Sequence, residues 1–282
     1  MRFEGIGVPW EIEALGGIPA GTQRAILRRV DDYDRVWSRF RADSLVSRIA
    51  REPGDWPLPA EAGPLLALYR ALYAATGGRM SPLVGASLER LGYGADLSLR
   101  PAGDPLPAVA WADAIAWDGA VLSAPRPVTI DVGAAGKGQL CDLLGEVLLE
   151  HGIDEFVIDA SGDILRRGPG TIRVALEHPA DPRLAVGVVP LGDGAICASA
   201  TNRRAWADGV HHVIDALTGL PVDDIVATWA MAADAMTADG VATALFVTPG
   251  DRIPCELGVE WARISAAGRV EVSEGFPGEV FG

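Results

Sequence analysis

Apolar residues near the start of the chain recur with the spacing of one strand and two helices. The stretch from Val8 to Leu15 is typical of a strand, and residues 21–37 predict an amphipathic helix with an arginine-rich outer face. A break rich in proline and glycine, residues 53–59, separates this helix from a second one over 64–75. The second helix is expected to end at Thr76-Gly-Gly78, because glycine readily adopts the left-handed conformation that closes helices.

Beyond residue 91 the chain changes character twice. Residues 92–128, rich in Gly, Pro and Trp, predict irregular strands and loops and a soft boundary between two lobes. From Val128 the pattern predicts a strand, a glycine loop, a helix over 140–151 and a strand over 156–160. Further strands are expected over 171–176, 184–190, 195–199 and 210–215, a turn over 217–221, and mostly helix passing into strand over 230–247. Alternating helices and strands of this kind predict an α+β fold.

Composition limits the partners that this chain can have. With 282 residues and 49% hydrophobic content, it can bury a large core as a single domain, with or without two packed lobes. A formal charge of -14 and a pI near 4.7 argue against nucleic acid. No charge-free apolar stretch of about 18 residues suggests a membrane span.

Two further expectations concern compartment and thiols. The first ten residues show no export signal, so the sequence as written favours the cytoplasm, whereas a removed leader would place the protein outside it; localisation stays open. The three cysteines, Cys141, Cys197 and Cys255, lack metal-site spacing and are expected to be buried thiols.

The glycine loop at 131–138 carries the one lysine of the chain, Lys137, among 24 Lys and Arg residues. A lysine is a compact charge on a flexible stem, and closely spaced glycines ahead of a helix let backbone N–H groups approach an anion. The spacing matches neither a nucleoside-triphosphatase loop nor a Rossmann fingerprint. The loop is therefore either a local site for an anionic ligand or a tight turn with a solvated lysine.

Two other segments carry candidate chemistry. Asp239 and Thr243 lie four residues apart and share one helix face, where a carboxylate and a hydroxyl suit Mg²⁺; alternatively, Asp239 stabilises a helix start and Thr243 bonds back to a carbonyl. His211 and His212 are adjacent in an extended segment, so at most one is expected to face a site. His212 is then a candidate general base or, equally, a hydrogen-bonded structural residue.

Taken together and in order, the segments of this chain resemble the FAD:protein FMN transferase family, also called the ApbE family. The resemblance covers nearly the whole chain, and its segments are Gly7–Ile12, Trp37–Arg48, Thr76–Gly78, Asp131–Gly138 with Asp142, Ser161–Asp163, His212–Asp215 with Thr218–Gly219, and Ala238–Asp239 with Thr243. It implies a mixed α+β fold with a nucleotide cleft between two packed lobes. It also implies Mg²⁺-dependent cleavage of FAD, with transfer of FMN to a Thr or Ser hydroxyl of an acceptor protein and release of AMP.

The resemblance further implies roles for individual residues. Asp239, Thr243 and the backbone oxygen of Ala134 would hold Mg²⁺, and His212 would act as the base. The dinucleotide would contact residues spread along the chain, namely Ile6, Phe40, Gly78, Arg79, Met80, Asp131, Lys137 and Val213.

The chain also departs from the pattern of the family at several positions, which include Met80-Ser81, Gln139, Ser161 and Ala200. Two other activities therefore stay open beside transfer. One is a Mg²⁺-dependent FAD pyrophosphatase that releases FMN and AMP, and the other is FAD binding without turnover.

Overall fold

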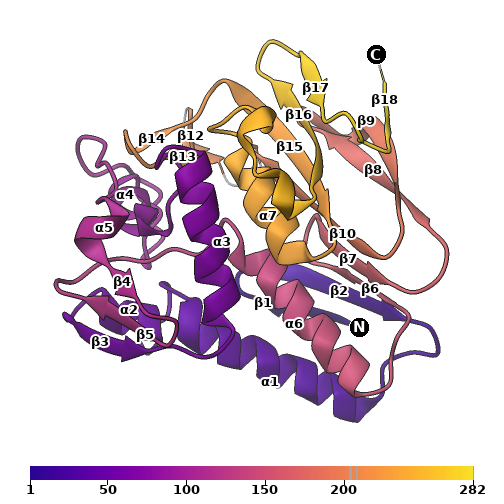
Figure 1. Cartoon of the computed structure of the whole chain (residues 1–282), viewed down its shortest axis with the longest axis horizontal. Helices are drawn as coiled ribbons and strands as arrows, with labels where there is room; N and C mark the ends of the chain where they lie inside the picture. Colours follow the sequence, from indigo (N-terminus) through magenta and orange to yellow (C-terminus); the bar gives the residue numbers. More distant parts are fainter. Residues whose placement is uncertain (203–204, 208, 282) are drawn as a thin grey trace.

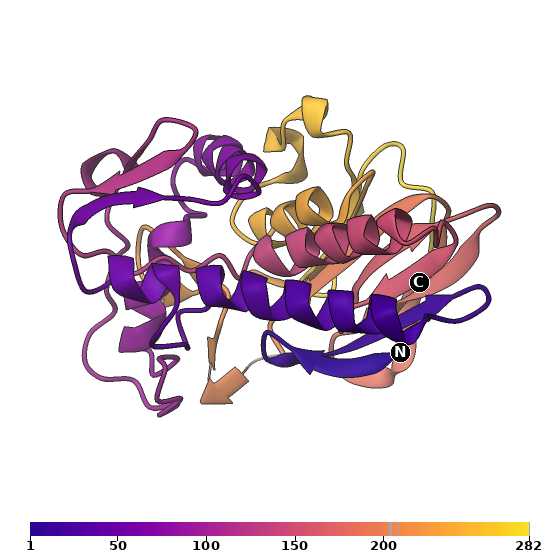
Figure 2. The same cartoon turned by 90° about the horizontal axis from the view of Figure 1, so that it is seen from below.

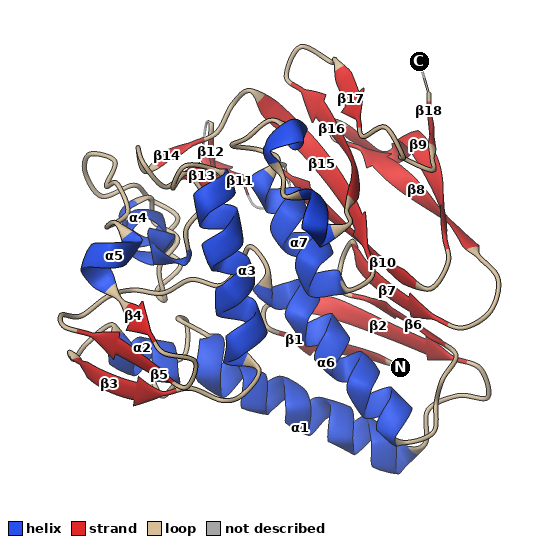
Figure 3. Cartoon of the chain, viewed as in Figure 1, coloured by secondary structure: helices blue, strands red, loops and turns tan. Residues whose placement is uncertain are grey.

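The computed structural model describes residues 1–202, 205–207 and 209–281, which form an α+β structure (Figures 1 and 3). Its α-helices are α1 (Ala20–Trp37), α2 (Leu45–Ile49), α3 (Ala62–Ala75), α4 (Gly85–Arg90), α5 (Trp111–Ala114), α6 (Gly136–Glu150) and α7 (Ala235–Ala244). Short 3₁₀ turns are at Pro82–Val84, Gly250–Arg252 and Cys255–Leu257. Figure 1 shows α4, α5 and the small strands β3 to β5 on one side of α3, and the main sheet with α6 and α7 on the other.

The main sheet has eight strands in the order β1-β2-β6-β7-β10-β15-β16-β17, and every neighbouring pair is antiparallel. Its strands are β1 (Arg2–Gly5), β2 (Val8–Ala14), β6 (Phe156–Asp159), β7 (Asp163–Arg167), β10 (Gly194–Ala200), β15 (Ile225–Ala232), β16 (Glu260–Ser265) and β17 (Val270–Val272). The N-terminal hairpin therefore joins a sheet whose centre comes from the second half of the chain.

Four smaller sheets complete the fold. They are β18-β9-β8, β3-β5-β4, and the pairs β11-β12 and β13-β14. Their strands are β3 (Gly54–Pro57), β4 (Ala116–Trp117), β5 (Val121–Ala124), β8 (Ile172–His178), β9 (Asp181–Leu191), β11 (Ala205–Ala207), β12 (Val210–His211), β13 (Ile214–Asp215), β14 (Leu220–Pro221) and β18 (Glu279–Val280). The β13–β14 hairpin follows the two histidines directly.

The main sheet is covered on both faces. Along β10, Ala195 and Cys197 belong to the core under the helices, whereas Ile196 belongs to a second core shared with β8 and β9. This two-residue alternation is what a strand buried on both sides requires. Figure 2 shows α1 running beside α6, on the helical side of the sheet. Helices α6 and α7 are thereby held together above the strands.

Several predicted elements are confirmed. The first strand and the two N-terminal helices correspond to β2, α1 and α3 within two residues at each end. Helix α3 ends where Gly77 and Gly78 take φ values of 61° and 87°. The N–H of Gly78 then donates to the carbonyl of Tyr73 at 2.8 Å, which closes the helix.

Other predicted elements are wrong. Residues 128–132 form no strand; Val128 and Ile130 are buried but have no ladder partner there, and α6 starts at Gly136 instead of residue 140. The segment 230–247 is the end of a strand followed by a helix, because β15 pairs with both β10 and β16, and this pairing outweighs the helix propensity of its alanines. Strand β3 occupies part of the stretch that was expected to be a break.

Two remaining expectations concern thiols and membranes. Cys141 and Cys197 are buried as predicted, whereas Cys255 is exposed, because it lies in a short 3₁₀ turn with no buried residue. Over the described residues, none of the helices combines the length and the apolar character that crossing a bilayer requires. The predicted soft boundary at 92–128 stays a prediction.

Candidate functional site

The loop before α6 is a compact turn, and the side chain of Asp131 at its start organises the backbone. The Asp131 carboxylate accepts a hydrogen bond from the N–H of Gly133 at 2.7 Å, and the N–H of Gly136 donates to the carbonyl of Val132 at 2.7 Å. The N–H of Ala134 donates to the hydroxyl of Tyr69 on α3 at 3.2 Å. These bonds fix the backbone on both sides of Ala134, whose carbonyl was predicted to hold the metal.

Helix α7 begins against α6 and is capped by two acidic side chains. Asp234 is its N-cap and accepts from the N–H of Thr237 at 2.7 Å, while Asp142 of α6 accepts from the N–H groups of Ala235 and Met236, both at 2.8 Å. Carboxylates at a helix N-terminus satisfy free N–H groups and interact favourably with the helix dipole. Asp142 thereby fixes the position of α7 relative to α6.

The two helices then come into backbone contact at Gly138. Its N–H donates to Asp239 Oδ2 at 2.9 Å, and a Cβ added at this glycine would lie 2.1 Å from the carbonyl oxygen of Ala235. On the other side of the contact, a Cβ added at Gly240 would lie 3.5 Å from Cβ of Ala135. The buried Asp239 carboxylate is therefore beside the loop that carries Ala134.

Lys137 lies in the first turn of α6 and points into the protein. Its ammonium forms an ion pair with Asp163, which is fully buried, and donates to the carbonyl of Ala160 at 3.1 Å. Burial lowers the pKa of this amine, but the carboxylates of Asp163 and Asp239 outweigh that effect and raise the pKa above its ordinary value. The alternative interpretation expected a solvated lysine, and this is wrong, since only 17% of the Lys137 side chain is exposed.

A second group of predicted residues meets around the β13–β14 hairpin. Arg79 Nε donates to Asp215 Oδ2 at 2.7 Å, and its carbonyl accepts from the N–H of Ala216 at 2.9 Å. The stretch from Gly78 to Met80 is thereby joined to the segment that contains Val213, and both Met80 and Val213 are buried. Arg79 also lines a cavity of about 640 Å³ between the residues after α7 and the ends of β15 and β16.

The two adjacent histidines differ in their surroundings. His211 is buried; its Nε2 lies 2.8 Å from the carbonyl of Val222, and its Nδ1 accepts from the N–H of Val213 at 3.2 Å. This pattern assigns the proton to Nε2 of a neutral ring, and burial lowers the pKa of His211 in the same direction. His211 is therefore a structural residue, and His212, which is half-buried, stays the predicted base.

Ile6 lies in the turn between β1 and β2, and Phe40 lies just after α1. Ile6 and Gly7 have φ values of 44° and 78° in the turn between β1 and β2, and the Ile6 side chain is half-buried. Phe40 follows α1 and is 41% exposed. Its neighbour Arg39 donates from Nε to Asp131 Oδ2 at 2.5 Å, which connects this segment to the glycine loop.

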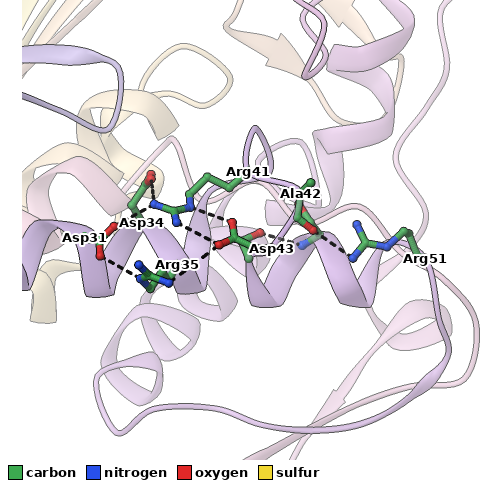
Figure 4. Close-up of polar contacts among 9 residues, drawn as sticks. Asp31, Asp34, Arg35, Arg41, Ala42, Asp43 and Arg51 are labelled. Carbon is green, nitrogen blue, oxygen red and sulfur yellow. Dashed lines mark hydrogen bonds and ion pairs between the residues drawn. The ribbon is translucent and has the colours of Figure 1, made fainter.

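Ion pairs at the protein surface also fix the segment that carries Phe40. Arg41 pairs with Asp31 and Asp34 of α1 at 2.9 and 3.1 Å, and with Asp43 at 3.0 Å (Figure 4). Arg35 pairs with the same Asp31 at 2.9 Å. This exposed network holds residues 38–44 against the end of α1.

Sequence analysis missed several residues that organise the site. Asp163 was named only as the end of the Ser161–Asp163 segment, and Arg39 and Tyr69 were assigned no role. Tyr33 of α1 donates from its hydroxyl to the carbonyl of Gly136 at 2.9 Å. Each of these contacts joins residues far apart in the chain, so only the Ser161–Asp163 motif could have pointed to one of them.

Comparisons with known proteins show the family of this chain. Residues 6–262 match the family model described as the ApbE family. A curated protein from Vibrio cholerae, named FAD:protein FMN transferase, is 28% identical over 247 residues, which cover 82% of this chain and 74% of that protein. One of the same name from Treponema pallidum is 27% identical over 276 residues, which cover 86% of this chain and 76% of that protein.

Solved structures show the same fold. The flavin transferase ApbE from Vibrio cholerae has a TM-score of 0.81 at 22% identity and covers 98% of this chain and 97% of its own. The ApbE protein from Thermotoga maritima has a TM-score of 0.83 at 22% identity and covers 97% of this chain and 96% of its own.

Proposed function

Because the chain belongs to the ApbE family, we propose that it transfers the FMN moiety of FAD to a Thr or Ser hydroxyl of an acceptor protein and releases AMP. The family predicted from the motifs is confirmed, as are the α+β fold and the expectation of an enzyme. The observation that carries the proposal is the contact between Asp239 and Gly138, which brings an acidic residue of α7 to the glycine loop at the start of α6.

The donor set at this contact suits Mg²⁺. Asp239 supplies a buried carboxylate, Thr243 lies one turn further along the same face of α7, and the Ala134 carbonyl belongs to the adjacent loop. The described residues contain no group of three or more His, Cys, Asp or Glu side chains that could enclose a metal. A single carboxylate with neutral oxygen donors fits an ion that keeps several waters and shares phosphate oxygens with its substrate. When bound there, Mg²⁺ would supply charge neutralisation at the diphosphate.

The residues of the chain would perform the remaining work. The acceptor hydroxyl oxygen would form a bond to the phosphorus of the FMN half while the bond from that phosphorus to the bridging oxygen breaks, and AMP would leave. His212 would take the proton of the hydroxyl. Lys137, fixed by Asp163, would hold a positive charge in the first turn of α6. The surfaces around Phe40, Ile6 and the Gly78–Met80 stretch would line the pocket for the flavin or the adenine.

The test is incubation with FAD and Mg²⁺, with and without an acceptor protein that carries a surface Thr. We expect AMP and covalent flavin only when the acceptor is present. AMP without acceptor would indicate a pyrophosphatase, and bound FAD without AMP would indicate a binding protein; either result would refute transfer.

Two variants at one position separate the metal from the fold. Asp239→Asn keeps an oxygen that can accept from Gly138 but removes the charge, whereas Asp239→Ala removes both. We expect both variants to lower turnover by at least about a hundredfold, because the diphosphate charge would no longer be neutralised. Asp239→Asn should also keep a melting temperature near that of the wild type. Turnover that survives in Asp239→Asn would contradict the metal assignment.

A further inference from the structure

Arg39 is a buried cation directly after α1, at the inner side of the segment that carries Phe40. Only 3% of its side chain is exposed, and its Nε donates to Asp131 Oδ2 at 2.5 Å. The guanidinium carbon lies 4.3 Å from the ring centre of Phe40 and 5.2 Å from that of Tyr93. Tyr93 in turn stacks on Trp206, with ring centres 5.2 Å apart. An aromatic cluster therefore surrounds the charge.

Among the described residues, the outer nitrogens of this guanidinium have no hydrogen-bond partner. Nη1 and Nη2 of Arg39 are both buried and unpaired within the part of the chain that the structure describes. The Phe40 and Tyr93 rings interact with the cation through their π faces, and this contact leaves the in-plane N–H donors unsatisfied. Buried charged donors without acceptors are unfavourable, so native proteins rarely keep them without a reason.

Other enclosed arginines of the chain use these nitrogens. Arg166 donates from Nη1 to Gly168 and from Nη2 to Pro169, and Arg263 pairs with Glu271 and donates from Nη1 to two carbonyls. Arg39 differs from both because it has one acceptor, Asp131, and that acceptor organises the candidate site.

We propose that Arg39 is a binding residue for FAD, in which Nη1 and Nη2 donate to an acceptor oxygen of the dinucleotide while Asp131 holds Nε. This inference rests on the proposed function. The ligand oxygen belongs either to the diphosphate or to the flavin ring, and both can accept from a planar guanidinium. Phe40 covers the guanidinium and is 41% exposed, so movement of this one ring opens the site to a ligand.

Direct binding tests the inference without turnover. The dissociation constant of FAD is measured by flavin fluorescence with no acceptor protein and no Mg²⁺, for the wild type, Arg39→Gln, Arg39→Lys and Asp131→Asn. Arg39→Gln is expected to weaken FAD binding by about 10- to 100-fold, the range for loss of hydrogen bonds to a charged group. Arg39→Lys keeps the charge but loses the fork, and at least a fivefold loss is expected. Arg183→Gln, which removes an exposed arginine paired with Asp181 on β9, is the control and should change affinity less than twofold.

A double-mutant cycle separates binding from support of the loop. If Arg39 only holds Asp131, then Arg39→Gln and Asp131→Asn weaken FAD equally and the double variant is no worse than either, which would overturn the inference. We expect instead a greater loss in Arg39→Gln than in Asp131→Asn. Should Arg39→Gln fail to fold, as judged by thermal melting, the affinity of Arg39→Lys decides, and an unchanged value refutes the inference.

Two partial ligands locate the acceptor oxygen. ADP carries a diphosphate without flavin, and riboflavin carries flavin without phosphate; each is measured by competition with FAD. The variant should weaken ADP if the diphosphate is bound, and riboflavin if the ring is bound. A wild type that fails to bind FAD both without Mg²⁺ and with it would overturn the proposed function together with this inference. If the wild type and Arg39→Gln bind FAD equally tightly, this inference alone is overturned.

Discussion

Replacing Gly138 by alanine should separate α6 from α7 and damage the candidate site. A Cβ at this position would lie 2.1 Å from the carbonyl oxygen and 2.6 Å from the carbonyl carbon of Ala235, and 2.8 Å from Cβ of Asp239. Backbone atoms of a capped helix cannot rotate away as a side chain can, so the helices themselves would have to move. The hydrogen bond from Gly138 to Asp239 would lengthen or break.

The magnitude follows from three contributions. Overpacking of a filled interior costs about 1–3 kcal/mol. Loss of a hydrogen bond to a charged group costs about 1.5–3 kcal/mol. Alanine regains about 1 kcal/mol of helix propensity relative to glycine. The free energy of unfolding should therefore fall by about 2–5 kcal/mol, which lowers the melting temperature by roughly 4–20 °C in a protein of this size.

Gly145→Ala is the matched control on the same helix. A Cβ at Gly145 would meet side-chain atoms, namely Leu165 Cδ2 at 3.0 Å and Phe156 Cζ at 3.4 Å, and these can shift. This variant should stay within about 1 kcal/mol of the wild type, because the gain in propensity offsets the crowding. Thermal melting followed by circular dichroism measures both variants. Equal melting temperatures for Gly138→Ala and Gly145→Ala would refute the argument that backbone contact at residue 138 sets the helix spacing.

The remaining predictions concern two buried charges. Burial raises the pKa of Asp142 from 3.8 to about 7, although its hydrogen bonds from backbone N–H groups favour the charged form. Between these two pKa values the folded state holds a proton that the unfolded chain releases, so the free energy of unfolding falls as pH rises. Relative to Asp142→Asn, the wild type should lose up to about 4 kcal/mol of unfolding free energy between pH 4 and 7.5, as measured by urea titrations. A difference in unfolding free energy between the two proteins that does not change with pH would exclude the raised pKa of Asp142. Lys137→Met should cost about 3–5 kcal/mol, because it leaves the buried Asp163 carboxylate unpaired, and adding Asp163→Asn should recover part of that loss in the same assay. An equally unstable double variant would contradict the pairing.

Local pattern was sufficient for the first helices of the fold. Helix α1 has a periodic apolar side that is buried at Ile26, Val30 and Tyr33, and its ends have polar or extended neighbours. Helix α3 ends at two glycines with positive φ. In both cases, the information lies within the segment itself, so no long-range contact had to be known.

The order of β15 and α7 could not be predicted in the same way. The residues of β15 include Ala227, Ala230 and Ala232, which favour a helix when considered alone, yet β15 lies between two partner strands. The start of α6 was missed for a related reason, since Gly136 and Gly138 are poor helix formers. Glycine is needed at these helical positions because Tyr33 crowds the space beside Gly136 and the backbone of α7 fills the space beside Gly138.

The candidate site was predicted in its parts but not in its connections. Asp239, Thr243 and the glycine loop were found from their residue types and from the family pattern. Their support comes from Asp142, Arg39 and Tyr69, which contact the site from other elements. The sequence spacing of such pairs carries no periodic signal, and the contacts appear only when the helices are placed over the sheet.

The structure gives a physical reason, independent of any ligand, why position 137 is a lysine and not an arginine. The Lys137 ammonium pairs with the carboxylate of Asp163 and donates to the carbonyl of Ala160, and the carboxylate of Asp239 adds to the negative field around it. An ammonium has three N–H donors, whereas a guanidinium has five in a rigid plane, and two acceptors in a closed space would leave more of the fork unsatisfied. At Arg39 the chain does bury such a fork with unused donors, next to an exposed ring that can move. The contrast assigns the position with acceptors of its own to lysine, and the position with unused donors, which a ligand can complete, to arginine.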